Sequence, residues 1–445
     1  MTLLIDRRSK HWVSITACQV LWFYVIIMCE WRTWNGRGDL QFRRSRQEAT
    51  QPRVLNSKSY IAMGFGPREL DWSVRVLYPY STGDKLGLGK ICDCITRTEQ
   101  SGKNMKVLIL SPFLSQSLSF ARLLARSKKF ERIDGGCLPG DIRSRKSKYY
   151  DSYLSVSGGD DLLGYELVIP GGANATEFLV RVKGDISIGQ VRYDSRNINY
   201  YNKLEFLDLM GSIGVEIPRT WNNLESIGGY RGKLFVKPEI EGAKGCRMMV
   251  SSPSDLPLEL KGGRYIYQEY IGTKCTYAYC FLAKDGIVLD SGMHKELLSY
   301  PREGGSAAVL ESCDIARIKD LSTHIVRELR YSGWGMIEYK WCNKRNDFVI
   351  MELNPKFWAS IEFILVNNPA FVKRLFGISV NRRKPRCMIW PDRLICNGLI
   401  NILRHWRCLS VATYVWEPRS IRELVAGAVS ANTRVKIKKR LKLAS

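Results

Sequence analysis

The sequence predicts a mixed chain, in which an α/β layer with a parallel sheet is followed by a larger α+β region. Met105–Ser111 (MKVLILS) is a short continuous apolar run, typical of a parallel strand that is buried on both faces. Gln116–Phe130 follows with apolar residues at helical spacing, and Gly164–Gly172 (GYELVIPGG) is typical of a second strand that ends in a glycine turn. This alternation favours a parallel sheet, whereas the closely spaced hairpin signals after Tyr200 favour α+β structure.

The composition indicates a globular protein with an anionic partner. The chain has 445 residues, of which 45% are hydrophobic and 25% charged, so two to four domains with a sizeable core are expected. A net charge of +25 indicates contact with phosphates, a nucleic acid or a membrane surface. No nucleic-acid partner is expected, because the sequence has no arginine-rich helix or RNA-binding aromatic signature. The 13 cysteines lack zinc spacing and fit reduced thiols better than a disulfide framework.

Residues 1–104 are expected to form a basic N-terminal extension. Within it, His11–Trp31 is largely apolar and long enough for a marginal membrane span at about 1.5 Å per residue. Basic residues stand on both sides of this segment, so the charges give no orientation. Two interpretations stay open, a membrane anchor and a buried or interfacial helix. The protein is expected to be cytoplasmic, with membrane association through this segment as the alternative.

Two strands around a glycine-rich turn suggest a phosphate-binding loop. Gly232–Val250 reads as a strand that ends at Lys237, a turn at Glu241–Gly245, and a returning strand. Glycines let backbone N–H groups approach a phosphate closely, and lysine supplies a positive charge. An ordinary β-hairpin has the same composition, so both interpretations stay open for this loop alone.

The next segments predict a strand that could face a nucleotide base and a further hairpin. Arg264–Gly272 (RYIYQEYIG) reads as a strand that could present backbone donors and acceptors to an adenine ring. Lys284-Asp285-Gly286 is a strong turn signal between two later strands. Residues from about 315 to 329 have one apolar face and are expected to form a packed helix.

Carboxylates at the end of the last predicted hairpin suggest a magnesium site. Gly335–Trp341 (GMIEYKW) and Phe348–Asn354 (FVIMELN) read as two strands joined by a tight turn. Side chains alternate along a strand, so Glu352 and Asn354 share a face, and a suitable register brings Glu338 beside them. Mg²⁺ prefers such oxygen ligands, although two glutamates on a hairpin can also form a solvated face.

The order of these motifs resembles the ATP-grasp superfamily, and most closely the carbamoyl-phosphate-synthase-like ATP-dependent carboxylate–amine ligases. The resemblance runs through KLEFLDLMGSIGVEIPRTW, LFVKPEIEGAKG, YIYQEYIG, HKELLSYPREGGSA, GMIEYKW and MELNPKFWAS. It implies a Rossmann-like α/β domain at 105–200 before an ATP-grasp domain at 201–377. The nucleotide-binding subdomains are expected at about 201–265 and 266–377. Residues 378–445 are then a basic C-terminal extension, whose end Thr433–Ser445 could be an amphipathic membrane-surface helix or a solvated tail.

The resemblance assigns roles to positions that match the family's motifs. It implies that Lys203 and Lys237 contact the nucleotide phosphates. The flexible loop that closes over the phosphates is implied to be Glu241, Gly242, Ala243, Lys244 and Gly245. The hinge segment around the adenine is implied to be Gln268, Glu269, Tyr270 and Ile271. The magnesium ligands are implied to be Glu338, Glu352 and Asn354.

Three further basic residues are implied to act near the reacting groups. His294 and Lys295 resemble a basic pair that precedes a glycine-rich loop, near the substrate or the γ-phosphate. Lys356 occupies a place where related sequences often have arginine. One departure is that Lys274 or Cys275 stands where many relatives have an acidic residue.

The expected function is therefore an ATP-dependent ligase that forms an acyl-phosphate and joins it to an amine, with ATP and Mg²⁺ or Mn²⁺. The expected partners are a small carboxylic acid or amino acid and an amine, and dimers are common in the family. The alternative is a catalytically decayed ATP-grasp protein that serves as a nucleotide- or membrane-surface-binding module. The altered segment at Lys274 and the basic ends of the chain motivate this alternative.

Overall fold

The computed structural model describes residues 105–414 with short gaps. The gaps are 128, 142–146, 244, 258–259, 261–263, 274, 301–304, 382–384, 398–400, 402–403, 406–407 and 409–411. The predicted extension 1–104, its apolar segment His11–Trp31 and the basic end Thr433–Ser445 lie outside the described residues, as do Lys244 and Lys274. All described residues belong to one compact unit, Thr96–Ser445. Within them, no helix combines the length and the apolar character needed to cross a bilayer.

The first domain contains a four-stranded parallel sheet with the order β3-β2-β1-β4. Its strands are β1 (Met105–Leu110), β2 (Phe130–Cys137), β3 (Ser152–Ser155) and β4 (Leu167–Ile169). Helix α2 (Ser115–Ser127) connects β1 to β2, and α3 (Ala173–Lys183) follows β4. The last four residues of β1 are fully buried, as expected for a strand covered on both faces. The predicted parallel α/β layer is thus confirmed.

A short connection leads from this domain to the nucleotide-binding region. It consists of β5 (Ile186–Ile188), β6 (Val191–Tyr193), the 3₁₀ helix η2 (Ser195–Tyr201) and α4 (Lys203–Ser212). Asn202 caps α4, because its side-chain oxygen accepts hydrogen bonds from the N–H groups of Leu204 (3.1 Å) and Glu205 (3.3 Å). This cap fixes the start of α4 and therefore the position of the Lys203 backbone.

The second sheet is small and antiparallel, with the order β7-β10-β8-β9. Its strands are β7 (Thr220–Trp221), β8 (Leu234–Pro238), β9 (Met248–Val250) and β10 (Tyr265–Glu269). Buried Leu234, Val236 and Tyr267 form its core with the 3₁₀ helix η3 (Glu225–Ile227). The predicted subdomain break at 265/266 falls inside β10, which pairs with β8 and β7.

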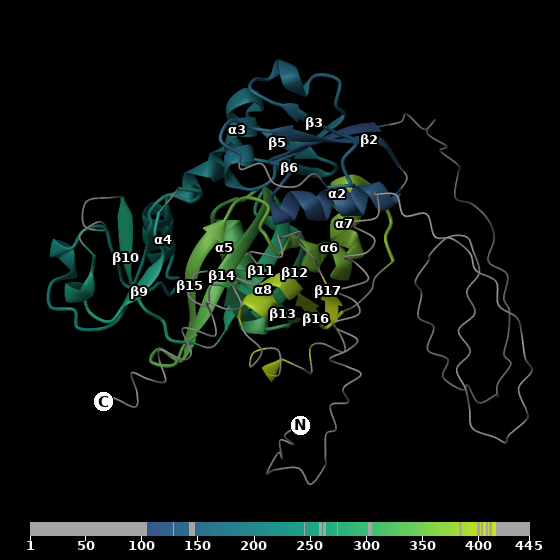
Figure 1. Ribbon diagram of the computed structural model, residues 1–445. Helices are drawn as coiled ribbons and strands as arrows, with labels where there is room; N and C mark the ends of the chain where they lie inside the picture. Colours follow the sequence, from purple (N-terminus) through teal and green to yellow (C-terminus); the bar gives the residue numbers. More distant parts are fainter. Residues whose placement is uncertain are drawn as a thin grey trace, which may run out of the picture. The chain divides into compact units, whose positions relative to one another are not determined.

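The third sheet has seven strands in the order β15-β14-β11-β12-β13-β16-β17 (Figure 1). Its strands are β11 (Thr276–Lys284), β12 (Ile287–Tyr300), β13 (Ser306–Ser312), β14 (Gly333–Cys342), β15 (Asp347–Asn354), β16 (Cys387–Ile389) and β17 (Ala412–Tyr414). Asp285 and Gly286 both have positive φ, as a two-residue hairpin turn requires. Strand β16 lies beyond the predicted domain end at 377 and still pairs with β13.

Helices cover both faces of the seven-stranded sheet. On one face, α5 (Ala316–Glu328) and α4 pack against Tyr279, Phe281 and Ile337. On the other face, α6 (Ile361–Asn367) and α7 (Pro369–Phe376) pack against Cys280 and Leu282, in a core shared with the parallel sheet. The remaining short helices are η1 (Asp160–Leu162), η4 (Pro253–Asp255) and α8 (Pro391–Cys396). The predicted order, a parallel α/β domain followed by antiparallel sheets, is thus present in the described part of the chain.

Candidate nucleotide and metal site

The hairpin of β14 and β15 brings the three predicted metal ligands together. Glu338 lies directly opposite Glu352 in the strand pair. The side-chain amide of Asn354 donates hydrogen bonds to Glu352 Oε1 at 3.1 Å and to Glu338 Oε1 at 3.4 Å. Two carboxylates and one amide therefore converge at one point on the sheet.

A β-bulge is responsible for this convergence. From Cys342 opposite Asp347 to Tyr339 opposite Ile350 the register is regular, and its continuation would set Glu338 opposite Met351. The register shifts after Glu338, so Met351 is the extra residue and Glu352 takes the opposing position. A bulge redirects the side chains that follow it, and here it places Glu352 on the same face as Glu338.

The charges around the carboxylates suit a divalent cation. Burial, followed by the charges of Glu352 and Glu296, raises the pKa of Glu338 to about 8. Burial also opposes ionisation of Glu352, but Lys237 and Lys203 lower its pKa below the ordinary value. Among the described residues, no three His, Cys, Asp or Glu side chains form a metal-binding group, so the predicted ligand set would depend on the Asn354 amide. The Asn354 amide would also have to turn its oxygen toward the carboxylates, because that oxygen accepts from Lys356 at 2.7 Å.

Lys237 connects the small sheet to this carboxylate pair. The residue is 5% exposed, and its Nζ donates to Glu352 Oε2 at 3.2 Å and to the Met351 carbonyl at 3.3 Å. Met351 is the bulged residue, so the bulge supplies one of the two acceptors for this ammonium group. The predicted phosphate-contacting lysine and the predicted metal ligands thus lie in direct contact.

A second charged cluster lies next to the first. Lys203 Nζ contacts Glu241 Oε2 at 2.5 Å, and Lys356 Nζ contacts Glu241 Oε1 at 3.0 Å. Burial lowers the pKa of Lys203. Burial would raise the pKa of Glu241, but Lys356 and Lys203 hold it well below its usual range. Lys356 also donates to Asn354, so the two clusters form one continuous network.

The predicted phosphate loop follows Glu241. Gly242 has φ 77°, and a Cβ there would come within 3.2 Å of Ala173 Cβ and Asn174 Oδ1 at the start of α3. A Cβ on Gly245 would lie 2.8 Å from Pro238. The Ala243 N–H donates to the Ile240 carbonyl at 3.3 Å, which makes a tight turn. Glycine at 242 and 245 therefore allows the loop to approach the first domain and β8 closely.

The predicted hinge segment runs along β10 and past its end. Gln268 is buried and donates from Nε2 to Thr220 Oγ1 at 3.1 Å, while Arg345 holds the Glu269 carboxylate at 2.6 Å. The Tyr270 N–H donates to the Lys233 carbonyl at 2.9 Å. Ile271 is buried in an apolar cluster with Cys342, Val349 and Met351. These apolar side chains lie close to the carboxylate pair and suit the face of a planar ring.

The two side chains of the predicted basic pair point to opposite faces of β12. His294 lies in line with Ala278 and Glu338 across β12, β11 and β14, and is buried next to Ser360, 3.3 Å from its hydroxyl. Lys295 points to the opposite face, where it pairs with Glu311 at 2.8 Å. The structure brings His294 to the face that carries Glu338 and does not bring Lys295 there.

His294 should make the stability of the protein depend on pH. Burial lowers the pKa of His294 from 6.5 to about 4. Below pH 6.5 the unfolded chain gains a proton that the folded protein does not accept until about pH 4, so stability falls as the pH falls. By pH 5 this loss reaches about 2 kcal/mol, and urea unfolding at pH 7 and pH 5 should show a smaller loss for His294→Gln.

The half-buried His324 on α5 provides the matched control, because His324→Gln also removes a histidine. The His324→Gln variant should lose stability between pH 7 and pH 5 as the parent protein does. An equal loss in His294→Gln would contradict the burial of a neutral imidazole.

Sequence reasoning missed two charged residues at the site. Glu296 lies two residues from His294, and Lys340 lies two residues from Glu338, so each shares the face of its predicted neighbour. Burial raises the pKa of Glu296 to about 7, and burial lowers that of Lys340. The same period-two rule that grouped Glu352 with Asn354 could have found both residues.

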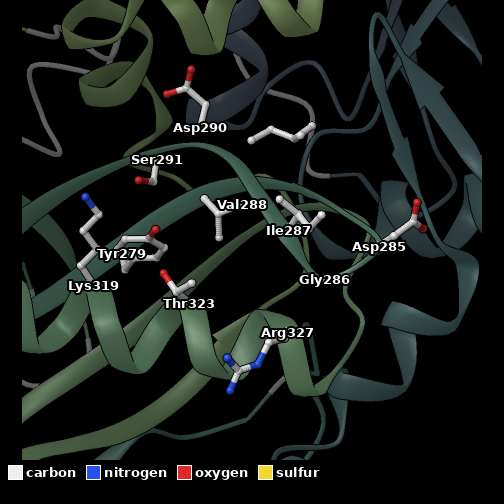
Figure 2. Close-up of a pocket in the computed structure, with 11 residues that line it drawn as sticks. Tyr279, Asp285, Gly286, Ile287, Val288, Asp290, Ser291, Lys319, Thr323 and Arg327 are labelled. Carbon is white, nitrogen blue, oxygen red and sulfur yellow. The ribbon is translucent and has the colours of Figure 1, made fainter.

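A cavity of about 520 Å³ lies elsewhere, between the start of β12 and α5 (Figure 2). Its polar lining residues are Tyr279, Asp285, Asp290, Ser291, Lys319, Thr323 and Arg327. Tyr279 belongs to the face covered by α5, which is opposite to the face of Glu338. None of the predicted site residues lines this cavity.

Of the comparisons with known proteins, the one with solved structures found similar proteins. No protein-family model matches the sequence, and no curated protein matches it. A pyruvate carboxylase variant from Rhizobium etli is 15% identical with a TM-score of 0.47, over 61% of this chain and 28% of that one. The chain thus spans less than a third of that enzyme.

Two shorter proteins are matched over more of their length. A biotin carboxylase from Campylobacter jejuni, solved as a complex with a form of ATP, is 15% identical with a TM-score of 0.45 over 62% of this chain and 72% of that one. Phosphoribosylamine–glycine ligase from Thermotoga maritima is 14% identical with a TM-score of 0.47 over 63% and 78%. These structural neighbours are ATP-grasp enzymes, and the likeness is one of fold.

Proposed function

We propose that the chain is an ATP-grasp protein that acts as an ATP-dependent ligase and joins a carboxylate substrate to an amine. The observation that carries this proposal is the contact between Lys237, Glu352, Asn354 and Glu338. Buried carboxylates with a buried ammonium group at their edge suit a nucleotide triphosphate and its cation better than a structural ion pair. The proposed metal ligands are Glu338, Glu352 and Asn354.

The proposed reaction has two steps. An oxygen of the acid forms a bond to the γ-phosphorus of ATP as the bond from that phosphorus to the bridging oxygen of ADP breaks. The amine nitrogen of the second substrate then bonds to the acyl carbon, phosphate leaves, and the amine loses a proton to solvent. Both steps depend mainly on positioning and charge neutralisation, so no protein nucleophile is required.

Each group of residues at the site would have its own role in this reaction. Bound at the carboxylate pair, Mg²⁺ or Mn²⁺ would neutralise charge on the β- and γ-phosphates. Lys237 and Lys203 would contact phosphate oxygens, and the apolar cluster around Ile271 would receive the base. The loop Glu241–Gly245 would cover the phosphates and exclude water that hydrolyses an acyl-phosphate. Lys356 would release the Asn354 oxygen to the cation and contact an oxygen of the phosphates instead.

Glu241 forms ion pairs with two lysines that would otherwise contact the phosphates, so its negative charge should weaken ATP binding. In Glu241→Gln, Lys203 and Lys356 lose their carboxylate partner and remain as buried cations. Mg²⁺–ATP should then bind about tenfold more tightly, because no carboxylate has to be displaced. The nucleotide-free protein should unfold at a lower temperature, because buried unpaired charges are costly.

Glu239→Gln is the matched control, because Glu239 precedes the loop and pairs with the exposed Arg264 instead. Calorimetric titration should give this variant the ATP affinity of the parent protein. Unchanged or weaker ATP binding by Glu241→Gln would contradict a competing role for Glu241.

The direct test of the function is a phosphate-release screen on the full chain. Pooled small carboxylic acids are combined with pooled amino acids and other amines, in the presence of Mg²⁺ and ATP. The proposal predicts release of ADP and phosphate that requires both pools. A protein that Mg²⁺–ATP stabilises against heat, but that releases no ADP with any pair of pools, would overturn the ligase and favour a nucleotide-binding module.

A further inference from the structure

The cavity between the start of β12 and α5, here called the β12–α5 cavity, has no role in the proposed ligase reaction (Figure 2). Its volume of about 520 Å³ lies within the range of small-molecule sites. It lies on the face of the seven-stranded sheet opposite to Glu338. A molecule bound in this cavity would therefore be separated from the proposed nucleotide site by the sheet.

Strand β12 and helix α5 form the two long walls of the β12–α5 cavity and run in opposite directions (Figure 2). At one end, the hairpin turn packs against the end of α5, because a Cβ on Gly286 would lie 3.2 Å from the Arg327 carbonyl oxygen. At the other end, Ser291 lies on the wall of β12 and Lys319 on that of α5. Eight helical steps separate Lys319 from Arg327, so the two ends are about 12 Å apart.

A β-bulge decides which side chains of β12 face α5. The register with β11 shifts between Leu282 and Ala283, so Leu289 is the extra residue of β12. Val288 and Ser291 would face opposite sides in a regular strand, but the bulge turns both toward α5. The wall of β12 therefore presents an apolar side chain near the hairpin turn and a hydroxyl at the far end.

The carboxylates of the two acidic lining residues are held by partners outside the cavity. Asp290 Oδ1 accepts from the Asn368 amide at 2.5 Å, and its Oδ2 lies 3.7 Å from the Arg374 guanidinium on α7. Asp285 accepts from the Ser332 hydroxyl at 3.2 Å. In Figure 2 both carboxylates point away from the centre of the cavity, so their charges are directed elsewhere.

A cation and three hydroxyl groups gather at the far end of the cavity. Lys319 is exposed and makes no ion pair or hydrogen bond with any residue that the structure describes. Tyr279 is 1% exposed, and its hydroxyl lies close to those of Ser291 and Thr323. Burial raises the pKa of Tyr279, and hydrogen bonds with these two residues partly oppose the rise. This end of the cavity therefore offers O–H donors beside a positive charge.

The hairpin end of the cavity is mainly apolar. Ile287 is 68% exposed, and Val288 and Leu289 are half-buried. The cation at this end, Arg327, already pairs with Glu328 at 3.2 Å. Apolar surface in contact with water is unfavourable, so an apolar ligand group that covered Ile287 would gain free energy.

We propose that the β12–α5 cavity binds a small amphipathic anion, a carboxylate or phosphate monoester that carries an apolar chain. The anionic group lies between Lys319 and the hydroxyls of Tyr279 and Ser291, because charged oxygens take strong hydrogen bonds from ammonium and hydroxyl groups. The apolar chain lies along Ile287 and Val288. This site is separate from the proposed nucleotide site and does not depend on the proposed function.

Sodium octanoate and sodium octyl phosphate are suitable probes, because each joins an anionic group to an apolar chain. Calorimetric titration of the full chain, below the concentrations at which the probes form micelles, gives their affinities. At least one probe should bind more tightly than sodium acetate, which lacks the chain, and than 1-octanol, which lacks the charge. The tighter of the two probes identifies the anionic group that the cavity prefers.

Two substitutions at exposed positions test the two ends of the cavity. Lys319→Met should weaken binding of the tighter probe about tenfold, because it removes a hydrogen bond to a charged group. Ile287→Ser should weaken it about fivefold, because less apolar surface is buried. Lys183→Met and Leu163→Ser are the matched controls, because both residues are exposed and lie outside the cavity. Both controls should retain the affinity of the parent protein.

Three results would overturn the assignment. Neither probe binds, or 1-octanol binds as tightly as the anions, or Lys319→Met binds the probe as tightly as the parent protein does; the last two would indicate adventitious apolar binding. Saturating Mg²⁺–ATP should not displace the probe, because the sheet separates the two sites. Displacement by Mg²⁺–ATP would place the probe in the nucleotide site and would also contradict the proposal. Failure of the ligase reaction would leave the predicted binding of the probe unchanged.

Discussion

Replacing Glu352 with glutamine is expected to lower turnover by on the order of a hundredfold or more. Glu352 faces Glu338 across the strand pair and accepts from both Lys237 and Asn354, so its charge is central to the network. Glutamine keeps the size of the side chain and removes the charge that would hold the cation on the phosphates. The measurement is the steady-state rate of ADP release with saturating substrates.

A folded variant with a lower unfolding temperature is expected, because the substitution relieves the repulsion between Glu352 and Glu338 but leaves the buried Lys237 without its carboxylate partner. Glu225→Gln is the control, since Glu225 is an exposed carboxylate on η3 away from the network. Its turnover should equal that of the parent protein. Near-normal ADP release by Glu352→Gln would defeat the proposed catalytic site.

Replacing Lys237 with methionine should weaken Mg²⁺–ATP binding by roughly a hundredfold, or about 3 kcal/mol. The ammonium group is buried between the carbonyl of the bulged Met351 and the Glu352 carboxylate. A water molecule in its place would not supply the positive charge. Methionine preserves the apolar stem and loses the contact with phosphate oxygens. Fluorescence or calorimetric titration with a nonhydrolysable ATP analogue and Mg²⁺ gives the affinity directly.

Lys233→Met supplies the comparison within the same segment, because Lys233 is exposed four residues before Lys237. The Lys233→Met variant should bind the analogue as tightly as the parent protein does. Equal affinities for the two variants would mean that Lys237 only neutralises Glu352 in the folded protein.

Local rules predicted much of the fold. The apolar run that became β1 and the Asp285–Gly286 turn depend on neighbouring residues alone, and both are present. Strand β16 shows the limit of such rules, because three residues beyond 377 join the sheet through a partner about 80 positions earlier. Pairing over such a distance leaves no periodic signal in the sequence.

The candidate site shows the same contrast between features that depend on neighbouring residues and features that depend on strand pairing. Glu338, Glu352 and Asn354 do meet, but their meeting depends on the bulge at Met351, which the period-two reading did not include. A strictly regular hairpin would have placed the two carboxylates on opposite faces. The resemblance assigns His294 and Lys295 to one basic pair, although adjacent residues of a strand point to opposite faces.

The most direct test of the central claim is to locate the cation itself. Crystals of the full chain grown with Mn²⁺ and a nonhydrolysable ATP analogue would be measured at the manganese absorption edge. We predict an anomalous peak within about 2.3 Å of side-chain oxygens of Glu338, Glu352 and Asn354, with Lys237 on the phosphates. A nucleotide bound elsewhere, or manganese that does not contact these three residues, would contradict the account.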